Sequence, residues 1–277
     1  MTISGSRVGP SVVENLQTIL AEASGEIIIV GFDEDATGDL VEILAESEDP
    51  PNVRLLVDED VLKWLRDDFV LASTAAELLE AERLDMRAVA PEQLDGELVV
   101  TEEAVVSLLT PDDDQSAALV TDDREFVTAV RECWSGVWEE SEEFALRTPA
   151  YSRVLETLGE EFGSEMTSDF RTVLESVTEM DEGELDEVEV SLLVAAKHEQ
   201  LLYDISRWGE DTGVASTATF SRTKTRLEEQ GVIDTEKVPI DVGRPRLRLL
   251  LGDERLREAD TEELPSVVRE LLSAAPA

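Results

Sequence analysis

The segment Leu201–Leu251 constrains the fold of this 277-residue chain more than any other. Its first part has apolar residues at the spacing of one helix face, followed by Gly209 and Gly213, which supply the break for a tight turn. A second helix is predicted to begin near Ser216 and to end at Gly231. Two helices joined by such a turn form a helix-turn-helix unit.

A two-stranded hairpin is predicted after the second helix. Residues 232–240 contain its first strand, and residues 246–251 form the second, in which leucines alternate with Arg246 and Arg248. The turn between the strands contains glycine and proline and carries Arg244 at its tip. The whole segment therefore has the layout of a winged helix-turn-helix domain.

The second helix carries cations and hydroxyls before its first carboxylate, Glu228. Such side chains suit phosphate oxygens and base edges in a DNA major groove, and arginines on a wing suit the phosphate backbone. Modules of this kind also mediate protein assembly, and that alternative stays open. The residues predicted to contact double-stranded promoter DNA are Ser216, Thr217, Thr219, Ser221, Arg222, Thr223, Lys224, Arg226, Arg244, Arg246 and Arg248.

The charge of the chain is strongly negative, yet its distribution favours DNA binding. The formal charge is -42, from 65 Asp and Glu against 23 Lys and Arg. Residues 197–257 hold 11 basic and 11 acidic residues, so this segment is neutral and the rest of the chain carries the whole excess. An acidic surface repels phosphate, so the basic residues are concentrated where the motif needs them.

The overall acidity, with only four lysines, is typical of cytoplasmic proteins of halophilic archaea. In concentrated salt, counterion release adds little to DNA affinity, so contacts from Thr219 and Phe220 to the bases are expected to gain importance. A single cysteine excludes an internal disulfide framework, and no apolar run reaches transmembrane length. We therefore expect a cytoplasmic protein with no membrane partner.

Residues 1–145 are predicted to form an α/β domain, a sheet layered with helices. Residues 1–10 are expected to be frayed. The order of elements resembles the phospholipase-D-like domain that serves as effector sensor in TrmB-type archaeal sugar regulators. The predicted elements are a helix at 12–23, a strand at 26–32, a helix at 37–46, a strand at 53–57, helices at 61–69 and 73–83, a strand at 85–89, a hairpin at 97–109, a strand at 117–120 and a helix at 122–141.

The residues present argue against catalysis. Phospholipase-D enzymes need paired His-x-Lys motifs, because one histidine attacks phosphorus and the other protonates the leaving group. The only histidine here, His198, lies outside the domain and lacks the lysine. No calcium-loop spacing and no glycine-rich nucleotide motif is present, so neither a metal nor a cofactor is predicted.

A small-molecule effector site is a possible use of the N-terminal domain. Ligands of open α/β sheets bind beyond the carboxyl ends of the strands, which here makes Gly31, Phe32 and Asp33 the candidate residues. An aspartate at such a position is equally expected as a helix N-cap. Both interpretations stay open.

The remaining segments are a helical linker at 146–182 and a winged helix-turn-helix domain at 183–277 that ends in a helix at 264–272. A dimer is expected, because two recognition helices one DNA turn apart read a palindrome. The helices between 151 and 177 and the terminal helix are candidate dimer surfaces. Alternatively, they only cover the core.

The motif FSRTKTRLEEQGVI at residues 220–233, followed by VGRPRL at 242–247, resembles the TbsP-like haloarchaeal transcriptional regulators. These combine a sensor-like N-terminal region with a C-terminal winged helix. The resemblance implies a DNA-binding homodimer that controls genes of carbon or sugar metabolism. TrmB-type regulators place the winged helix first, so their sugar specificity does not transfer. The alternative is a non-catalytic metabolite-binding or adaptor protein whose winged helix mediates assembly.

Overall fold

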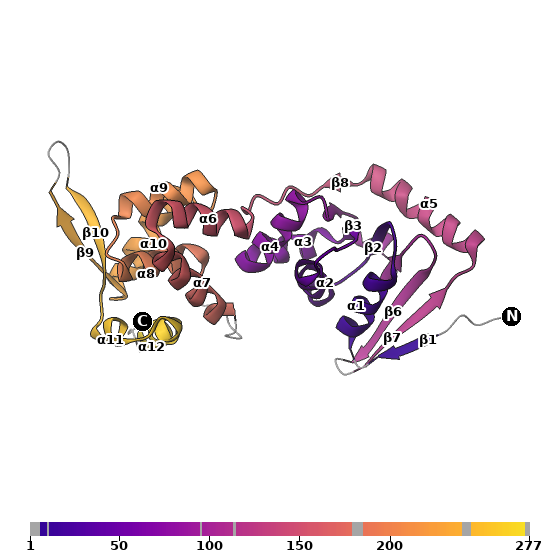
Figure 1. Cartoon of the computed structure of the whole chain (residues 1–277), viewed down its shortest axis with the longest axis horizontal. Coiled ribbons are helices and arrows are strands. Elements are labelled where there is room, and N and C mark those ends of the chain that lie inside the picture. The colour runs from indigo at the N-terminus through magenta and orange to yellow at the C-terminus, as the bar shows by residue number, and fades with distance from the viewer. Residues whose placement is uncertain are drawn as a thin grey trace. The chain divides into compact units, whose positions relative to one another are not determined.

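A computed structural model describes residues 6–9, 11–94, 96–112, 115–178, 185–239 and 245–274. The chain divides into an N-terminal unit, Met1–Leu146, and a C-terminal unit, Arg147–Ala277 (Figure 1). No helix in these ranges combines the length and the apolar character that crossing a membrane requires. The predicted pairing of an α/β domain with a helix-turn-helix domain is confirmed.

Among the described residues of the N-terminal unit, eight strands form one sheet in the order β1-β7-β6-β5-β2-β3-β4-β8. The neighbouring strands β2, β3 and β4 are parallel, and the strands on either side of them pair antiparallel. The strands are β1 (Ser6–Gly9), β2 (Glu26–Val30), β3 (Asn52–Val57), β4 (Leu84–Ala88), β5 (Leu98–Val100), β6 (Val105–Asp112), β7 (Gln115–Thr121) and β8 (Glu142–Glu143).

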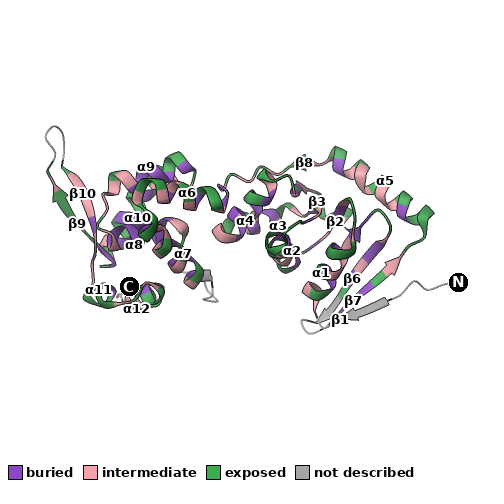
Figure 2. Ribbon diagram, viewed as in Figure 1, coloured by how far each residue is buried: buried purple, intermediate pink, exposed green. Residues whose placement is uncertain are grey.

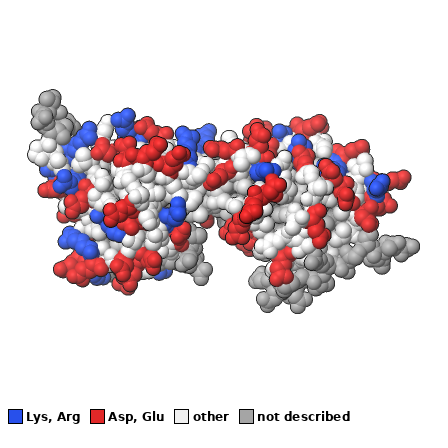
Figure 3. Space-filling view, viewed as in Figure 1, with Lys and Arg blue, Asp and Glu red and all other residues white. Residues whose placement is uncertain are grey.

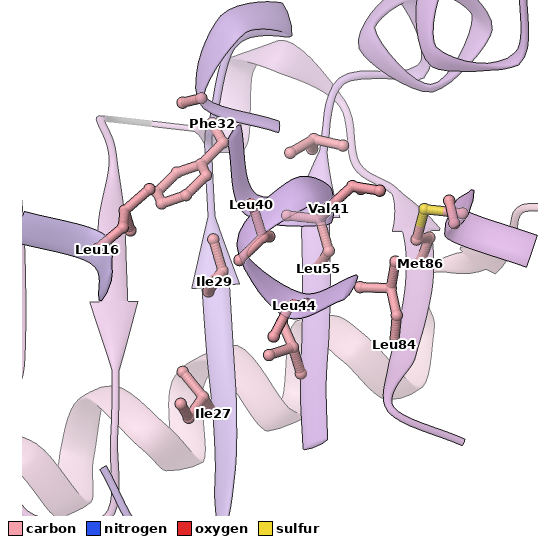
Figure 4. Close-up of a cluster of buried hydrophobic side chains, with 14 of the residues drawn as sticks. Leu16, Ile27, Ile29, Phe32, Leu40, Val41, Leu44, Leu55, Leu84 and Met86 are labelled. Atoms are coloured by element: carbon pink, nitrogen blue, oxygen red, sulfur yellow. The ribbon is translucent and has the colours of Figure 1, made fainter. Parts of the chain in front are cut away.

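Helices cover both faces of this sheet. On one face, Leu16 and Leu44 pack with Ile29 and Leu55 in a large apolar core (Figure 4). On the other face, Trp138 packs in a smaller apolar core with residues of β2, β3, β5 and β6. The first face carries α1 (Val12–Glu22), α2 (Glu34–Glu46), α3 (Glu59–Asp67) and α4 (Phe69–Glu80); the second carries α5 (Arg124–Glu140), and η1 (Pro91–Gln93) follows β4.

Several bounds predicted for this unit were wrong; helix α4, for example, begins at Phe69 and not at Ser73. Two of the errors have a clear physical cause. Residues 6–9 are not frayed, because they pair antiparallel with β7, Ser6 opposite Leu119. Four residues carry too little periodicity to reveal a strand whose position is set by its partner. Helix α2 begins at Glu34, three residues early, because the Asp33 carboxylate accepts a hydrogen bond from the Ala36 amide at 2.9 Å.

The C-terminal unit has a helical core with a hairpin beside it (Figure 2). Its elements are α6 (Tyr151–Phe162), α7 (Ser164–Thr178), α8 (Glu187–Lys197), α9 (Leu202–Thr212), α10 (Thr217–Glu229), β9 (Ile233–Val238), β10 (Arg246–Leu251), α11 (Glu254–Glu258), η2 (Thr261–Glu263) and α12 (Leu264–Ala274).

Helices α6 and α7 belong to this core and do not form a separate linker. Trp208 of α9 makes edge contacts with the rings of Phe162 and Phe170, and its indole N–H donates to the Thr157 hydroxyl at 3.0 Å. The apolar faces of α6 and α7 are thus buried within their own unit. A dimer surface on these helices, as predicted, would need exposed apolar residues, and the apolar residues of α6 and α7 face the core instead.

His198 has a structural partner at the end of α8. Its Nε2 lies 2.8 Å from Asp169 of α7, which also pairs with Lys197 at 2.9 Å and accepts a hydrogen bond from Thr261. Partial burial alone would raise the pKa of Asp169, but the hydrogen bonds from Lys197, His198 and Thr261 hold it below its ordinary value. The histidine therefore joins α7 to α8.

Candidate nucleic-acid interface

Helices α9 and α10 form the predicted helix-turn-helix. Gly213 ends α9 in the left-handed conformation at φ 95°, and the Ser216 hydroxyl caps α10 by accepting from the Thr219 amide at 3.1 Å. Gly209 does not break the helix as predicted. It lies inside α9, where a Cβ atom would come within 2.2 Å of the Phe220 ring. The glycine is needed for the close packing of α9 on α10.

Helix α10 has a buried and an exposed face. Phe220, Thr223, Lys224 and Leu227 follow each other at helical spacing and are all buried. The exposed face is lined by Ala218, Ser221, Arg222, Thr225 and Glu229. Thr225 is a polar residue of this face that the site prediction missed, although its spacing of seven from the exposed Ala218 would have placed it there.

Thr223 and Lys224 are poorly placed to contact DNA. Their relative exposures are 7% and 8%. The Lys224 ammonium donates to Glu228 at 2.8 Å, and Glu228 also accepts from the Thr235 hydroxyl on β9 at 2.6 Å. These two bonds lower the pKa of Glu228. Lys224 thus ties the helix to the hairpin, and the prediction of a DNA contact does not fit this packing. The same holds for Phe220, which is fully buried.

Arg226 is exposed but already paired. Its guanidinium donates to the Glu189 carboxylate at 2.7 Å and lies 3.9 Å from Asp186. Glu189 also accepts from the Asp186 amide, which completes a capping box at the start of α8. Burial raises the pKa of Glu189, while the bond from the Asp186 amide and the charge of Arg226 oppose that rise. The Asp-x-x-Glu pattern at residues 186–189 is the sequence signal of this capping box.

The amino end of α10 is exposed and polar. The Thr217 amide and hydroxyl both donate to the Glu210 carboxylate at 3.4 Å. The Thr219 hydroxyl accepts from Arg222 at 3.4 Å. A carboxylate of α9 thus lies at the helix end, where the backbone amides favour anions.

The hairpin has the alternation predicted for a wing. Leu249 and Leu251 are buried, and Arg246 and Arg248 point to the other side. The Arg246 guanidinium lies 4.1 Å from the centre of the Tyr203 ring and 3.1 Å from Asp204. Arg248 is 3.5 Å from Glu236 on the opposite strand. Arg244, predicted at the wing tip, lies outside the described residues.

Most cations of this surface therefore have a carboxylate partner. Among the described residues of α10 and the hairpin, Arg222 and Lys237 have none within 4.0 Å. Both are exposed. Figure 3 shows Lys and Arg side chains interspersed with acidic ones on the C-terminal unit.

The proposed ligand residues of the N-terminal unit have structural roles. Phe32 is buried in the core, and Asp33 caps α2, as the alternative interpretation predicted. Gly31 has φ 72°, and a Cβ atom there would lie 2.4 Å from the Gly96 carbonyl oxygen. The nearby Glu97 has a pKa raised to about 6, by burial and by repulsion from Asp33.

A polar groove of about 660 Å³ lies at the amino ends of β2, β3 and β4, away from residues 31–33 at the carboxyl end of β2. Its lining includes Gln17, Glu26, Glu46, Asn52 and Arg83. The Arg83 guanidinium donates to the Asn52 amide oxygen at 3.2 Å, to the Pro50 carbonyl and to Asp49. Within the described parts of the chain, no group of three or more His, Cys, Asp and Glu residues is arranged to hold a metal ion.

An α/β domain followed by a winged helix-turn-helix is an architecture found among DNA-binding regulators of transcription. Two family models match the chain: the N-terminal domain of TbsP-like transcriptional regulators at residues 6–149, and their C-terminal helix-turn-helix domain at residues 150–269. The protein belongs to the TbsP-like family of transcriptional regulators.

Similarity to solved structures is partial. TrmBL2, described as an archaeal chromatin protein with a novel mode of DNA binding, shares 17% identity with a TM-score of 0.37. The match covers 52% of this chain and 55% of TrmBL2. Nuc, a phospholipase D family member from Salmonella typhimurium, shares 12% identity with a TM-score of 0.36, over 50% of this chain and 97% of Nuc. No curated protein matches the chain.

Proposed function

We propose that the protein binds promoter DNA sequence-specifically as a homodimer, with the exposed face of α10 in the major groove. The observation that carries this proposal is Arg222. It is exposed at the centre of that face, between Ser221 and Thr225, and no carboxylate of the described residues pairs with it. An arginine in this position suits bidentate recognition of guanine.

The other contacts are assigned by exposure. Ser216, Thr217 and Thr219 at the amino end of α10 suit phosphate or base contacts. Arg246, Arg248, Lys237 and the predicted Arg244 suit the phosphate backbone beside the groove. Thr223 and Lys224 are left out because they are buried, and Arg226 is left out because it holds Glu189.

The family resemblance supports further parts of the proposal. We infer a haloarchaeal regulator of carbon or sugar metabolism genes that acts in the cytoplasm, where the DNA is. The acidic, lysine-poor composition supports the halophilic origin. We expect no phospholipase-type activity, because the chain has a single histidine and no His-x-Lys motif. Growth-dependent changes in promoter occupancy, with and without glucose, test the metabolic assignment. Occupancy that is insensitive to carbon source would contradict it.

We propose that the dimer forms through one face of β6 and β7. On this face α5 covers Val105, while Leu109 and Leu119 remain 48% exposed. By register, Ser107, Ala117 and Thr121 share the face and carry no charge. Residues 1–146 contain 36 acidic and eight basic residues, so two copies repel each other over most of this unit. An uncharged face is where they can meet, in the self-complementary manner of a two-fold interface.

For a small-molecule effector we propose the polar groove instead of residues 31–33. Carboxylates, amides and a guanidinium line it, and these groups bind polar molecules rich in hydroxyls. Hydrogen exchange with glucose as the probe tests this site. Slower exchange of residues 46–52 is expected, and protection confined to residues 31–33 would contradict the assignment.

The central test is specific binding by an Arg222→Ala variant. Sites are first selected from fragmented genomic DNA with the intact protein, and affinities are then measured for a selected duplex and a scrambled one. Each protomer of the dimer loses one bidentate base contact worth about 1–3 kcal/mol, so the preference for the selected site should fall by at least roughly 30-fold.

Arg153→Ala is the matched control, because Arg153 is an exposed arginine of α6 with no ion pair among the described residues. It should leave the preference unchanged. If Arg222→Ala still preferred the selected duplex over the scrambled one as strongly as the wild type does, the placement of α10 in the groove would be contradicted. Absence of any sequence preference in the wild type would favour the assembly function instead.

A further inference from the structure

We propose that carboxylates of α9 and β9 act as built-in counterions of the DNA-binding surface and reduce the dependence of its DNA affinity on salt. This inference rests on the proposed DNA binding. It assigns a role to Asp204 and Glu236, which hold the two wing arginines at 3.1 and 3.5 Å.

These two carboxylates are accessible and their pairs are easily opened. The side chains of Asp204 and Glu236 are 33% and 58% exposed, and exposed ion pairs contribute little to stability. A DNA phosphate therefore replaces the carboxylate at small cost. Glu189 differs, because its side chain is only 7% exposed and would be left buried and charged if Arg226 turned to DNA. That pair stays closed and positions the helix.

The exchange has a definite ion balance. In an ordinary complex, each protein cation that meets a phosphate displaces a condensed counterion into solution, and log K falls with log salt by about 0.9 per contact. Here the arginine leaves a carboxylate when it meets the phosphate. The carboxylate then takes up a solution cation in place of the one that the phosphate released. Arg246 and Arg248 therefore add affinity without adding to the salt dependence.

The carboxylates also restrain non-specific binding. Non-specific affinity for DNA comes almost entirely from unpaired cations facing phosphate. Pairing leaves Arg222 and Lys237 as the described cations of α10 and the hairpin without a carboxylate partner. Sequence reading by the α10 face therefore accounts for a larger share of the total affinity. Asp204 and Glu236 act in this sense as specificity-determining residues.

The test measures affinity against KCl concentration for the full-length wild type and for the Glu236→Gln, Asp204→Asn and double variants. Fluorescence anisotropy with a selected duplex and a scrambled duplex gives both affinities. Each substitution frees one arginine in each protomer of the proposed dimer, so the slope of log K against log KCl should steepen by about 1.8, and by about 3.6 in the double variant. Affinity for the scrambled duplex at low KCl should rise several-fold.

Glu160→Gln is the matched control, since Glu160 is exposed on α6 and pairs with no arginine in the part of the chain that the structure describes. It removes the same charge and should leave the slope unchanged. The inference is wrong if the wing variants keep the wild-type slope, or if Glu160→Gln steepens it equally. No binding by the wild type at any KCl concentration would instead contradict the proposed function itself.

Discussion

Glu97 has the acid–base behaviour of a carboxyl group that the fold partly removes from water. Its pKa is raised to about 6 from an ordinary value near 4.5, by burial and by the negative charge of Asp33. A raised pKa in the folded state means that folding favours the protonated form. This contribution to stability is complete below about pH 4.5 and is lost as the pH rises through about 6.

Glu97→Gln should therefore stabilise the protein at neutral pH. We expect a gain of about 1 kcal/mol at pH 8, after allowance for the partial exposure of the side chain, and a gain that shrinks towards pH 5. Thermal unfolding followed by circular dichroism between pH 8 and pH 5 measures this. Equal stability of variant and wild type at pH 8 would mean that Glu97 is well solvated.

At the element scale, helix α10 shows which parts of a site the sequence can predict. The helix, its Ser216 cap and its Gly231 stop were predicted within a residue or two, because capping and chain-reversal residues act locally. The choice of DNA contacts by chemistry alone included Thr223 and Lys224, which are buried. The buried positions Phe220 and Leu227 already fixed the phase of the helix, and its phase places Lys224 inside.

Other features depend on partners that are distant in sequence. Strand β1 exists because β7 offers it an edge, and its residues 6–9 are 107 or more positions away from those they pair with. The pairing of Arg226 with Glu189 spans 37 positions. Local patterns cannot predict such contacts, which arise only when tertiary packing brings the elements together.

The packing of α9 on α10 depends on Gly209. A methyl group there would lie 2.2 Å from the Phe220 ring, which is itself fully buried and cannot move freely. We expect Gly209→Ala to destabilise the C-terminal unit by about 1–3 kcal/mol through overpacking, and to weaken DNA binding with it.

Thermal unfolding and DNA titration of Gly209→Ala provide the measurement. Gly136→Ala is the control, because Gly136 lies in α5 with no atom within 4 Å of a Cβ position, and there alanine should stabilise the helix by up to about 1 kcal/mol. If Gly209→Ala left the free energy of unfolding unchanged, the two helices would be able to separate without cost.

At the scale of the whole molecule, charge is the main constraint on association. The chain carries -42, and its N-terminal unit contains the larger share of the excess acid. High salt screens this repulsion, so assembly should strengthen as salt rises. The uncharged face of β6 and β7 is the surface that we propose for the second copy.

Leu119→Glu should convert the dimer to a monomer, because it brings two carboxylates together at a contact that excludes water. Light scattering after size-exclusion chromatography, in low and high KCl, measures the mass. Gln17→Glu adds the same charge on α1, which covers the opposite face of the sheet, and should remain dimeric. This interface would be contradicted if the wild type were a monomer at both KCl concentrations, or if the Leu119→Glu variant were a dimer. Circular dichroism confirms that both variants are folded.

The four tryptophans are unevenly divided, and this gives the protein an internal label. Trp64, Trp134 and Trp138 lie in the N-terminal unit, whereas Trp208 is the one tryptophan of residues 147–277. It is packed between Phe162 and Phe170 at the junction of α6, α7 and α9. In protein grown with fluorotryptophan, a single fluorine resonance therefore reports on the helical core behind the DNA-binding surface. Its chemical shift, followed while DNA is added, reveals whether that core repacks during recognition, without any engineered probe.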